Sequence, residues 1–166
     1  MKNTNHLLCG LFLLLAVSGT VSSKDWRSIA PLRSTLEDVE KLLGRSTLGS
    51  KYIYETEEGR IFFFYQSDPN AACGNGSTIY NVPFGTIFSI QIESKKKPLL
   101  VNLNLNMSKF RRYATCIGAI GYYNAEEGFE MHVYNDVVST FYYQPSAADA
   151  KQFACSKANE QKAAGS

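Results

Sequence analysis

The sequence contains few residues of the kinds that bind metal ions or start covalent chemistry. Its 166 residues include two histidines and four cysteines, none of them in a Cys-x-x-Cys pair, so no zinc site of the usual ligand type can be assembled. A nucleophile elbow of the form Gly-x-Ser-x-Gly, a phosphate-binding loop and a dinucleotide-binding glycine pattern are also absent from the sequence. We therefore expect no metal and no cofactor, and we expect His132 to be an exposed strand residue rather than a catalytic base.

The chain also lacks an excess of charge of either sign. Seventeen Lys and Arg residues against fifteen Asp and Glu residues give a formal net charge of +2. Its basic clusters are short, at 95–97 and 111–112, and the first precedes Pro98 in what is expected to be a solvated loop. So small a net charge gives no electrostatic reason to expect binding to nucleic acid or to an anionic membrane.

Long apolar runs are missing except at the N-terminus. Leu7 to Val17 are apolar apart from one glycine, with a lysine before them and small residues after them. A membrane-spanning helix needs ~20 apolar residues, whereas this arrangement is typical of a secretory signal peptide. We expect residues 1–23 to be removed by cleavage after Ser23, with cleavage after Gly19 as the alternative. A lipid-anchored form is less favoured, because Cys9 does not follow the apolar run. The predicted location is extracytoplasmic, in the periplasm or secreted, with no transmembrane segment after signal removal.

In an oxidising compartment, two of the three cysteines beyond the signal peptide would normally pair. Cys73 lies in a loop rich in Asn and Gly, and Cys155 lies near the C-terminus, so both can move to meet. Cys116 lies in an apolar stretch typical of a small buried residue. We favour a Cys73–Cys155 disulfide with Cys116 free, and the sequence leaves the other two pairings open.

A capped helix is expected shortly after the signal peptide. Either Ser34 with Glu37 or Thr35 with Asp38 has the spacing of a capping box, and Gly44 is placed to end the helix. Trp26 precedes this helix and is expected to pack against it.

The rest of the chain is predominantly strand-like. Apolar alternation and turn signals predict strands at 51–56, 60–66, 85–93, 99–105, 120–124, 129–134 and 137–143. Residues 107–113 are expected to form one or two helical turns, and Ser146 to cap a short C-terminal helix. The predicted fold is a single α+β domain over residues 24–155, with a curved antiparallel sheet of about six or seven strands. Residues 156–166 are expected to form a disordered tail.

Tyrosines are the leading candidates for a binding surface. Two adjacent pairs, Tyr122 with Tyr123 and Tyr142 with Tyr143, lie on expected strands, and half of such residues must leave the core of a two-sided sheet. Tyrosine is common at binding surfaces because it combines apolar area with a hydroxyl group. Ordinary packing of these tyrosines against loops is nevertheless the favoured interpretation.

Carboxylates are the candidates for catalysis. Glu58 and Glu127 each lie in a Glu-Glu-Gly turn, and two carboxyl groups that converge can divide acid and base roles. Solvated turns are the favoured interpretation of both residues.

Scattered residues along most of the chain resemble a family of uncharacterised exported bacterial proteins. The matching residues are Trp26-Arg27-Ser28-Ile29, Pro31-Leu32, Ser34-Thr35, Asp38-Val39-Glu40, Leu42-Leu43-Gly44, Asn81-Val82-Pro83, Tyr122-Tyr123, Glu126-Glu127-Gly128, Tyr143, Pro145-Ser146, Asp149 and Cys155. The resemblance implies export and a Cys73–Cys155 pair, but no activity. Leu36, where the family usually has Arg, and Cys116 depart from its pattern.

A helix that ends in Leu-Leu-Gly before a β-meander is also similar to the SmpA/BamE-type domain and to the β-lactamase inhibitor protein, which implies a fold and nothing more. From the sequence, the leading functional hypothesis is a non-catalytic exported protein that binds a protein or envelope component. The alternatives are a small secreted hydrolase that uses the turn carboxylates, or an inhibitor of a secreted enzyme.

Overall fold

The computed structural model describes residues 23–46, 48–69, 73 and 80–155. The expected signal peptide, except for Ser23, and the expected C-terminal tail lie outside these residues. Within the described part of the chain, two α-helices accompany one antiparallel sheet of seven strands that is not closed into a barrel. The predicted α+β fold is confirmed. None of the helices described reaches the length and hydrophobicity needed to cross a membrane.

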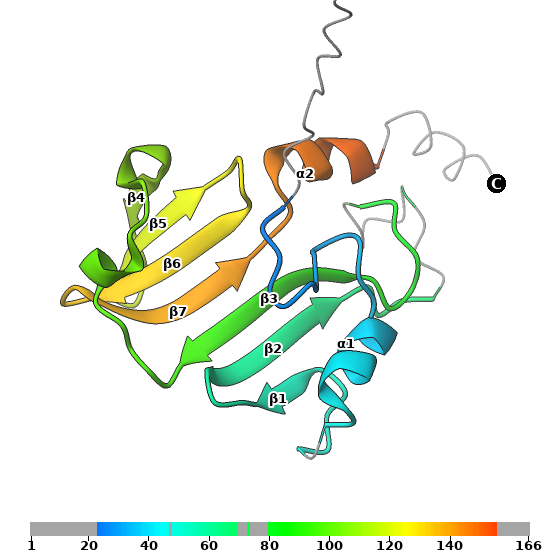
Figure 1. Cartoon of the computed structure of the whole chain (residues 1–166). Helices are drawn as coiled ribbons and strands as arrows, with labels where there is room; N and C mark the ends of the chain where they lie inside the picture. The colour runs from blue at the N-terminus through cyan, green and yellow to red at the C-terminus, as the bar shows by residue number, and fades with distance from the viewer. Residues whose placement is uncertain (1–22, 47, 70–72, 74–79, 156–166) are drawn as a thin grey trace, which may run out of the picture.

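The sheet consists of two meanders joined side by side (Figure 1). The first contains β1 (Ile53–Glu55), β2 (Gly59–Tyr65) and β3 (Ile87–Ser94), and the second contains β4 (Arg111–Ala114), β5 (Ile120–Asn124), β6 (Phe129–Tyr134) and β7 (Val137–Tyr143). Strand β7 pairs with both β6 and β3, so the spatial order is β1-β2-β3-β7-β6-β5-β4. The last strand of the chain thus joins the two halves.

Helix α1 (Leu36–Leu43) forms where the sequence predicts it. Thr35 and Asp38 make the capping box, since the Thr35 side chain accepts from the Asp38 amide while the Asp38 carboxylate accepts from the Thr35 amide. Gly44, with φ 77°, ends the helix in a conformation that favours glycine. The helix buries Val39 against the first meander, in a cluster that also contains Trp26 and Phe63.

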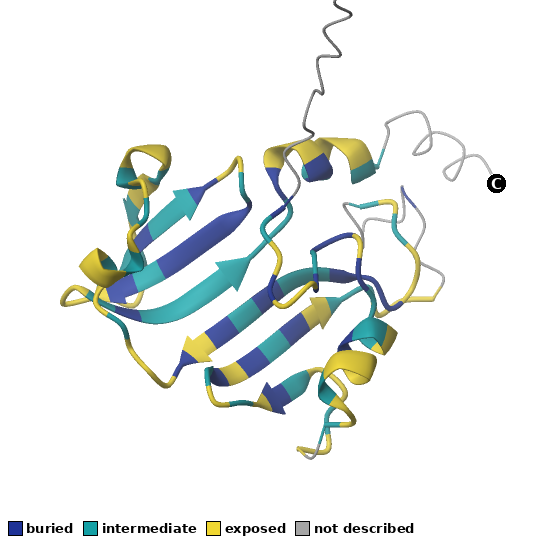
Figure 2. Cartoon of the chain, in the orientation of Figure 1, coloured by how far each residue is buried: buried dark blue, intermediate teal, exposed yellow. Residues whose placement is uncertain are grey.

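One face of the sheet carries the core in two clusters. Ile61, Phe63 and Ile90 are central to the first, while Phe129 and Met131 are central to the second. The side chains of Phe141 and Tyr143 on β7 pack against both clusters. Strands β2 and β3 show the resulting alternation of buried and more exposed residues, whereas most of β7 is half-buried (Figure 2).

Of two predictions between β3 and β5, the first is wrong and the second is right only for its first three residues. Residues 99–105 were expected to form a strand, but Leu100–Leu103 form a 3₁₀ helix, whose Leu100 and Leu103 pack against the second cluster. The spacing of Leu100 and Leu103 also suits a 3₁₀ turn, in which residues i and i+3 share a side. Residues 107–113 contain only a short 3₁₀ helix, Met107–Lys109, before the chain enters β4.

The C-terminal helix α2 (Ala147–Phe153) is capped by Ser146, as predicted. Just beyond it, Cys155 forms the expected disulfide with Cys73, with their Cα atoms 5.2 Å apart. This bond joins the loop between β2 and β3 to the end of α2.

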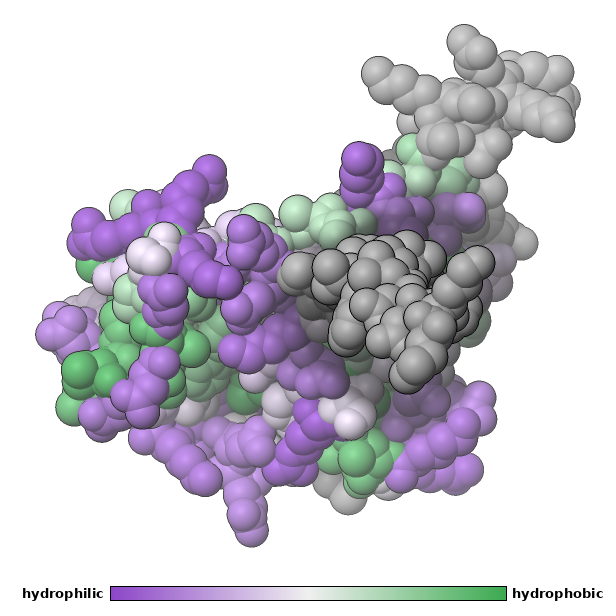
Figure 3. Space-filling view, turned by 45° about the horizontal axis from the view of Figure 1, so that its top comes forward, coloured by the Kyte–Doolittle hydropathy of each residue, from purple (hydrophilic) through white to green (hydrophobic). Residues whose placement is uncertain are grey.

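Cys116 is free but exposed, so the prediction that it is buried is wrong. It lies in the turn between β4 and β5 beside Ile117, which is 73% exposed. Hydrophobic side chains gather at this end of the molecule (Figure 3). The apolar stretch around Cys116 thus belongs to a turn, and apolar residues in a turn need not be buried.

We expect Cys116 to react with a maleimide reagent in the folded, non-reduced protein within minutes, because its thiol is accessible. Intact mass spectrometry of the mature chain, which has lost Cys9 with the signal peptide, would show one added label on the wild-type protein and none on Cys116→Ser. Two or more labels without denaturant would contradict the Cys73–Cys155 disulfide. Absence of any label would contradict the exposure of the Cys116 thiol.

Candidate functional site

The face of the sheet opposite the core carries a cluster of hydrogen-bonded aromatic and polar side chains. Strand β6 places Phe129 and Met131 in the core, so its alternate residues Glu130 and His132 lie on the opposite face. The register pairs Glu130 with Tyr123 on one side and Tyr142 on the other. We call this side of the sheet the polar face, defined by Tyr113, Tyr123, Glu130, His132, Tyr142 and Gln144.

Glu130 organises the polar face. Its side chain is only 11% exposed, and its Oε1 accepts a hydrogen bond from His132 Nε2 at 2.8 Å and another from the Tyr113 hydroxyl. Gln144 Nε2 donates to Oε2 of the same carboxylate at 2.8 Å. A carboxylate that accepts several hydrogen bonds holds its partners in fixed orientations, so Glu130 acts as a positioning residue for its neighbours.

Tyr113 reaches this cluster from β4 because its partner on β5 is a glycine. A Cβ atom on Gly121 would lie 2.3 Å from the Tyr113 ring, so the ring occupies the space that a side chain would fill. Burial first, and then the hydrogen bond to Glu130, raise the pKa of Tyr113 well above its ordinary value. The hydroxyl therefore stays protonated and remains a donor at neutral pH.

His132 is the most informative departure from the sequence prediction. It was expected to be an exposed strand residue, but its side chain is only 15% exposed. Its ring centroid lies 4.7 Å from that of Tyr142, and its Nε2 faces both Glu130 and, at 3.4 Å, the Tyr113 hydroxyl. The alternation on β6 predicts that Glu130 and His132 share a face, but their contacts with Tyr113 depend on a strand that the sequence analysis missed.

The four candidate tyrosines divide equally between the two faces. Tyr122 and Tyr143 pack against the second core cluster, whereas Tyr123 and Tyr142 lie on the polar face beside Glu130. Burial is the main cause that raises the pKa of both Tyr123 and Tyr142, and Glu130 adds to it. The structure therefore brings two of the four into one cluster and assigns the other two to the core.

The candidate carboxylates Glu58 and Glu127 are not brought together. The Glu58 turn adjoins the end of β3, where the Lys95 amide donates to the Glu58 carbonyl, whereas the Glu127 turn adjoins the far end of β7. Strands β2 and β6 run in opposite directions within the sheet. The first residue of β2 and the first residue of β6 therefore lie at opposite ends of the sheet along the strand direction. Each carboxylate also has its own cation, Arg27 for Glu58 and Lys24 for Glu127.

Glu58 is held in place rather than free in solvent. Trp26 Nε1 donates to its Oε2 at 2.8 Å and Arg27 donates to its Oε1 at 2.8 Å. Partial burial would raise its pKa, but the hydrogen bonds from Trp26 and Arg27 outweigh burial and lower it. A lowered pKa suits a structural ion pair and not a general acid.

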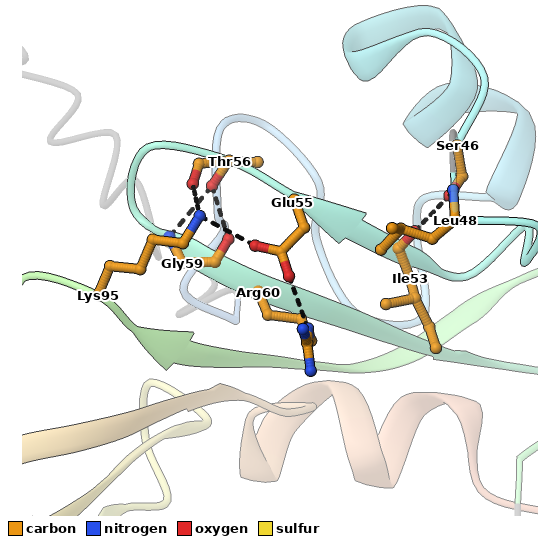
Figure 4. Close-up of polar contacts among 8 residues, drawn as sticks. All are labelled: Ser46, Leu48, Ile53, Glu55, Thr56, Gly59, Arg60 and Lys95. Carbon is orange, nitrogen blue, oxygen red and sulfur yellow. Dashed lines mark hydrogen bonds and ion pairs between the residues drawn. The ribbon is translucent and has the colours of Figure 1, made fainter.

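The turn that carries Glu58 is fixed by contacts of its own (Figure 4). Glu55 accepts from Arg60 at 2.7 Å and pairs with Lys95 at 2.9 Å, and Lys95 also donates to the Thr56 carbonyl. The Thr56 hydroxyl closes the turn on the Gly59 carbonyl at 3.1 Å. These contacts account for the conformation of the β1–β2 turn without any catalytic role for its carboxylates.

Two open hollows lie away from the centre of the polar face. The larger, of about 760 Å³, lies beside α1, and the lining residues include Leu36, Tyr54, Tyr65 and Phe84. The smaller, of about 490 Å³, lies at the β4–β5 edge, and its lining includes Arg111 and Tyr123. Among the described residues, no group of three or more His, Cys, Asp or Glu side chains is arranged to hold a metal ion.

Comparison with known proteins gives no relative from which a role could be transferred: no family model, curated sequence or solved structure matches this chain.

Proposed function

We propose that this is an exported, non-catalytic protein that binds a protein or envelope component through the polar face of its sheet. The observation that carries the proposal is that the rings of Tyr142 and His132 pack in a tilted arrangement on this face, with their centroids 4.7 Å apart, while Glu130 fixes the His132 ring. Export is supported by the signal-like N-terminus and by the Cys73–Cys155 disulfide, which persists in oxidising compartments.

The chemistry of the face suits recognition. Tyr123 and Tyr142 offer aromatic area and protonated hydroxyls, and rigid aromatic side chains lose little conformational entropy when they bind. Residues of this kind, positioned beforehand by neighbours, are typical of the few residues that dominate binding energy at interfaces.

Affinity capture from the native envelope fraction tests the proposal when it is done with matched variants. We expect the wild-type protein to recover one stoichiometric partner and Tyr142→Ala to recover at least about ten-fold less, because loss of a dominant interface residue costs ~2 kcal/mol or more. Tyr52→Ala is the matched control, since Tyr52 is an exposed tyrosine outside the polar face, at 44% exposure.

The melting temperature of each variant would establish that the fold is retained before capture is compared. Equal recovery by wild-type protein and Tyr142→Ala, or no partner at all, would overturn the proposed binding surface. Retention of the intact chain in the cytoplasm would overturn export.

A further inference from the structure

Ser23, the first residue described, belongs to the folded domain. It is only 7% exposed, and its backbone nitrogen lies 2.7 Å from Oδ2 of Asp149. Its hydroxyl donates to the same carboxylate oxygen and accepts from the Ser146 amide at 3.1 Å. Cleavage after Ser23 would remove all three of these buried hydrogen bonds.

Asp149 offers the Ser23 nitrogen a buried negative charge. The residue is only 1% exposed, and its Oδ1 pairs with the guanidinium of Arg33, whose own side chain is 42% exposed. Its Oδ2 accepts from Ser23 and from the Ser146 hydroxyl, which are both neutral donors in the intact chain. A buried carboxylate is stabilised most by a charged donor at hydrogen-bond distance, and the Ser23 nitrogen is at that distance.

We propose that the chain is cleaved between Ser22 and Ser23, and that the new α-ammonium group of Ser23 pairs with Asp149 inside the folded domain. This inference rests on the export proposed above. Hydrolysis by a signal-peptide endopeptidase adds the oxygen of water to the Ser22 carbonyl carbon as the C–N bond breaks. The released nitrogen gains protons and becomes the ammonium group.

The sequence is compatible with this cut. Thr20 and Ser22 are small uncharged residues at the third and first positions before the bond, where such an endopeptidase requires them. The product keeps the Ser23 hydroxyl in its contacts with Asp149 and Ser146 and replaces one neutral donor by a cation. Cleavage of the Ser22–Ser23 bond would thereby create a buried ion pair between the Ser23 ammonium group and Asp149 in the mature protein.

The first test identifies the N-terminus. The full chain would be expressed in a secreting bacterial host, recovered from outside the inner membrane and analysed by intact mass and N-terminal sequencing. We expect Ser23 as the first residue. A first residue of Lys24 or Thr20 would overturn this inference and leave export intact, whereas an unprocessed chain retained in the cytoplasm would count against export itself.

The second test asks whether the ammonium group pairs with Asp149. Two purified chains would be compared, one beginning at Ser23 and one carrying Thr20 to Ser22 as an N-terminal extension, each with and without Asp149→Asn. We expect the Ser23 chain to melt about 3 °C or more above the extended chain, and we expect Asp149→Asn to abolish that difference. Equal melting temperatures of the two chains with Asp149 present, or a difference that persists in Asp149→Asn, would overturn the ion pair.

Discussion

Replacement of both Cys73 and Cys155 by serine is expected to lower the free energy of unfolding by about 4 kcal/mol. The disulfide joins residues separated by 82 positions, and a cross-link across so long a loop strongly restricts the unfolded chain. Urea unfolding of the wild-type protein and the double variant, both under non-reducing conditions, measures the difference.

Cys116→Ser is the matched control for this experiment. Because Cys116 is exposed and free, its replacement should change the stability by less than about 0.5 kcal/mol. Reduction of the wild-type disulfide should reproduce the loss seen in the double variant. If the double variant and the wild-type protein unfold at the same urea concentration, the disulfide does not contribute as the loop length implies.

Local signals in the sequence were sufficient for the elements that depend on neighbouring residues. The Thr35–Asp38 capping box and the Ser146 cap lie within three or four residues of the atoms they satisfy, and the turn at Asn135-Asp136 uses residue types that tolerate positive φ. For the same reason, β5, β6 and β7 were predicted close to their observed bounds.

The wrong or missing predictions of secondary structure fall where tertiary contacts decide the conformation. Strand β4 has only four residues and no apolar alternation. Its extended conformation depends on pairing with β5 and on the space beside Gly121 that the Tyr113 ring fills. Alternating apolar residues at 99–105 predicted a strand, but packing against the second core cluster selects a 3₁₀ helix.

The candidate site was predictable only in part, for a related reason. The pattern of β6 places Glu130 and His132 on one face, but the sequence does not say which strands lie beside β6. The order β3-β7-β6-β5 brings Tyr142 and Tyr123 to opposite sides of Glu130. The same order separates Glu58 from Glu127, although their turns have nearly the same sequence.

Asp149 is expected to be the polar residue whose loss costs the fold most. Asp149→Asn should lower the free energy of unfolding by about 3 kcal/mol near neutral pH, because it removes a buried charge that Arg33, Ser23 and Ser146 all contact. Asp38→Asn provides a control, since Asp38 also accepts hydrogen bonds at a helix cap but is half-buried at the surface. That substitution should cost ~1 kcal/mol.

The effect of Asp149→Asn should also depend on pH in a defined direction. Burial alone would raise the pKa of Asp149, but hydrogen bonds from Ser23, Arg33 and Ser146 outweigh it and lower the pKa to about 2, from an ordinary value of 3.8. Because the folded pKa lies below the unfolded one, this part of the stability, about 2 kcal/mol, is present above pH 3.8 and is lost as the pH falls toward 2. Urea unfolding at several pH values should therefore show a constant difference between the wild-type protein and Asp149→Asn from pH 5 to 7, and a smaller difference below pH 3.8. A difference that stayed constant down to pH 2 would mean that the charge of Asp149 does not stabilise the fold, and that its contribution comes from shape and neutral hydrogen bonds alone.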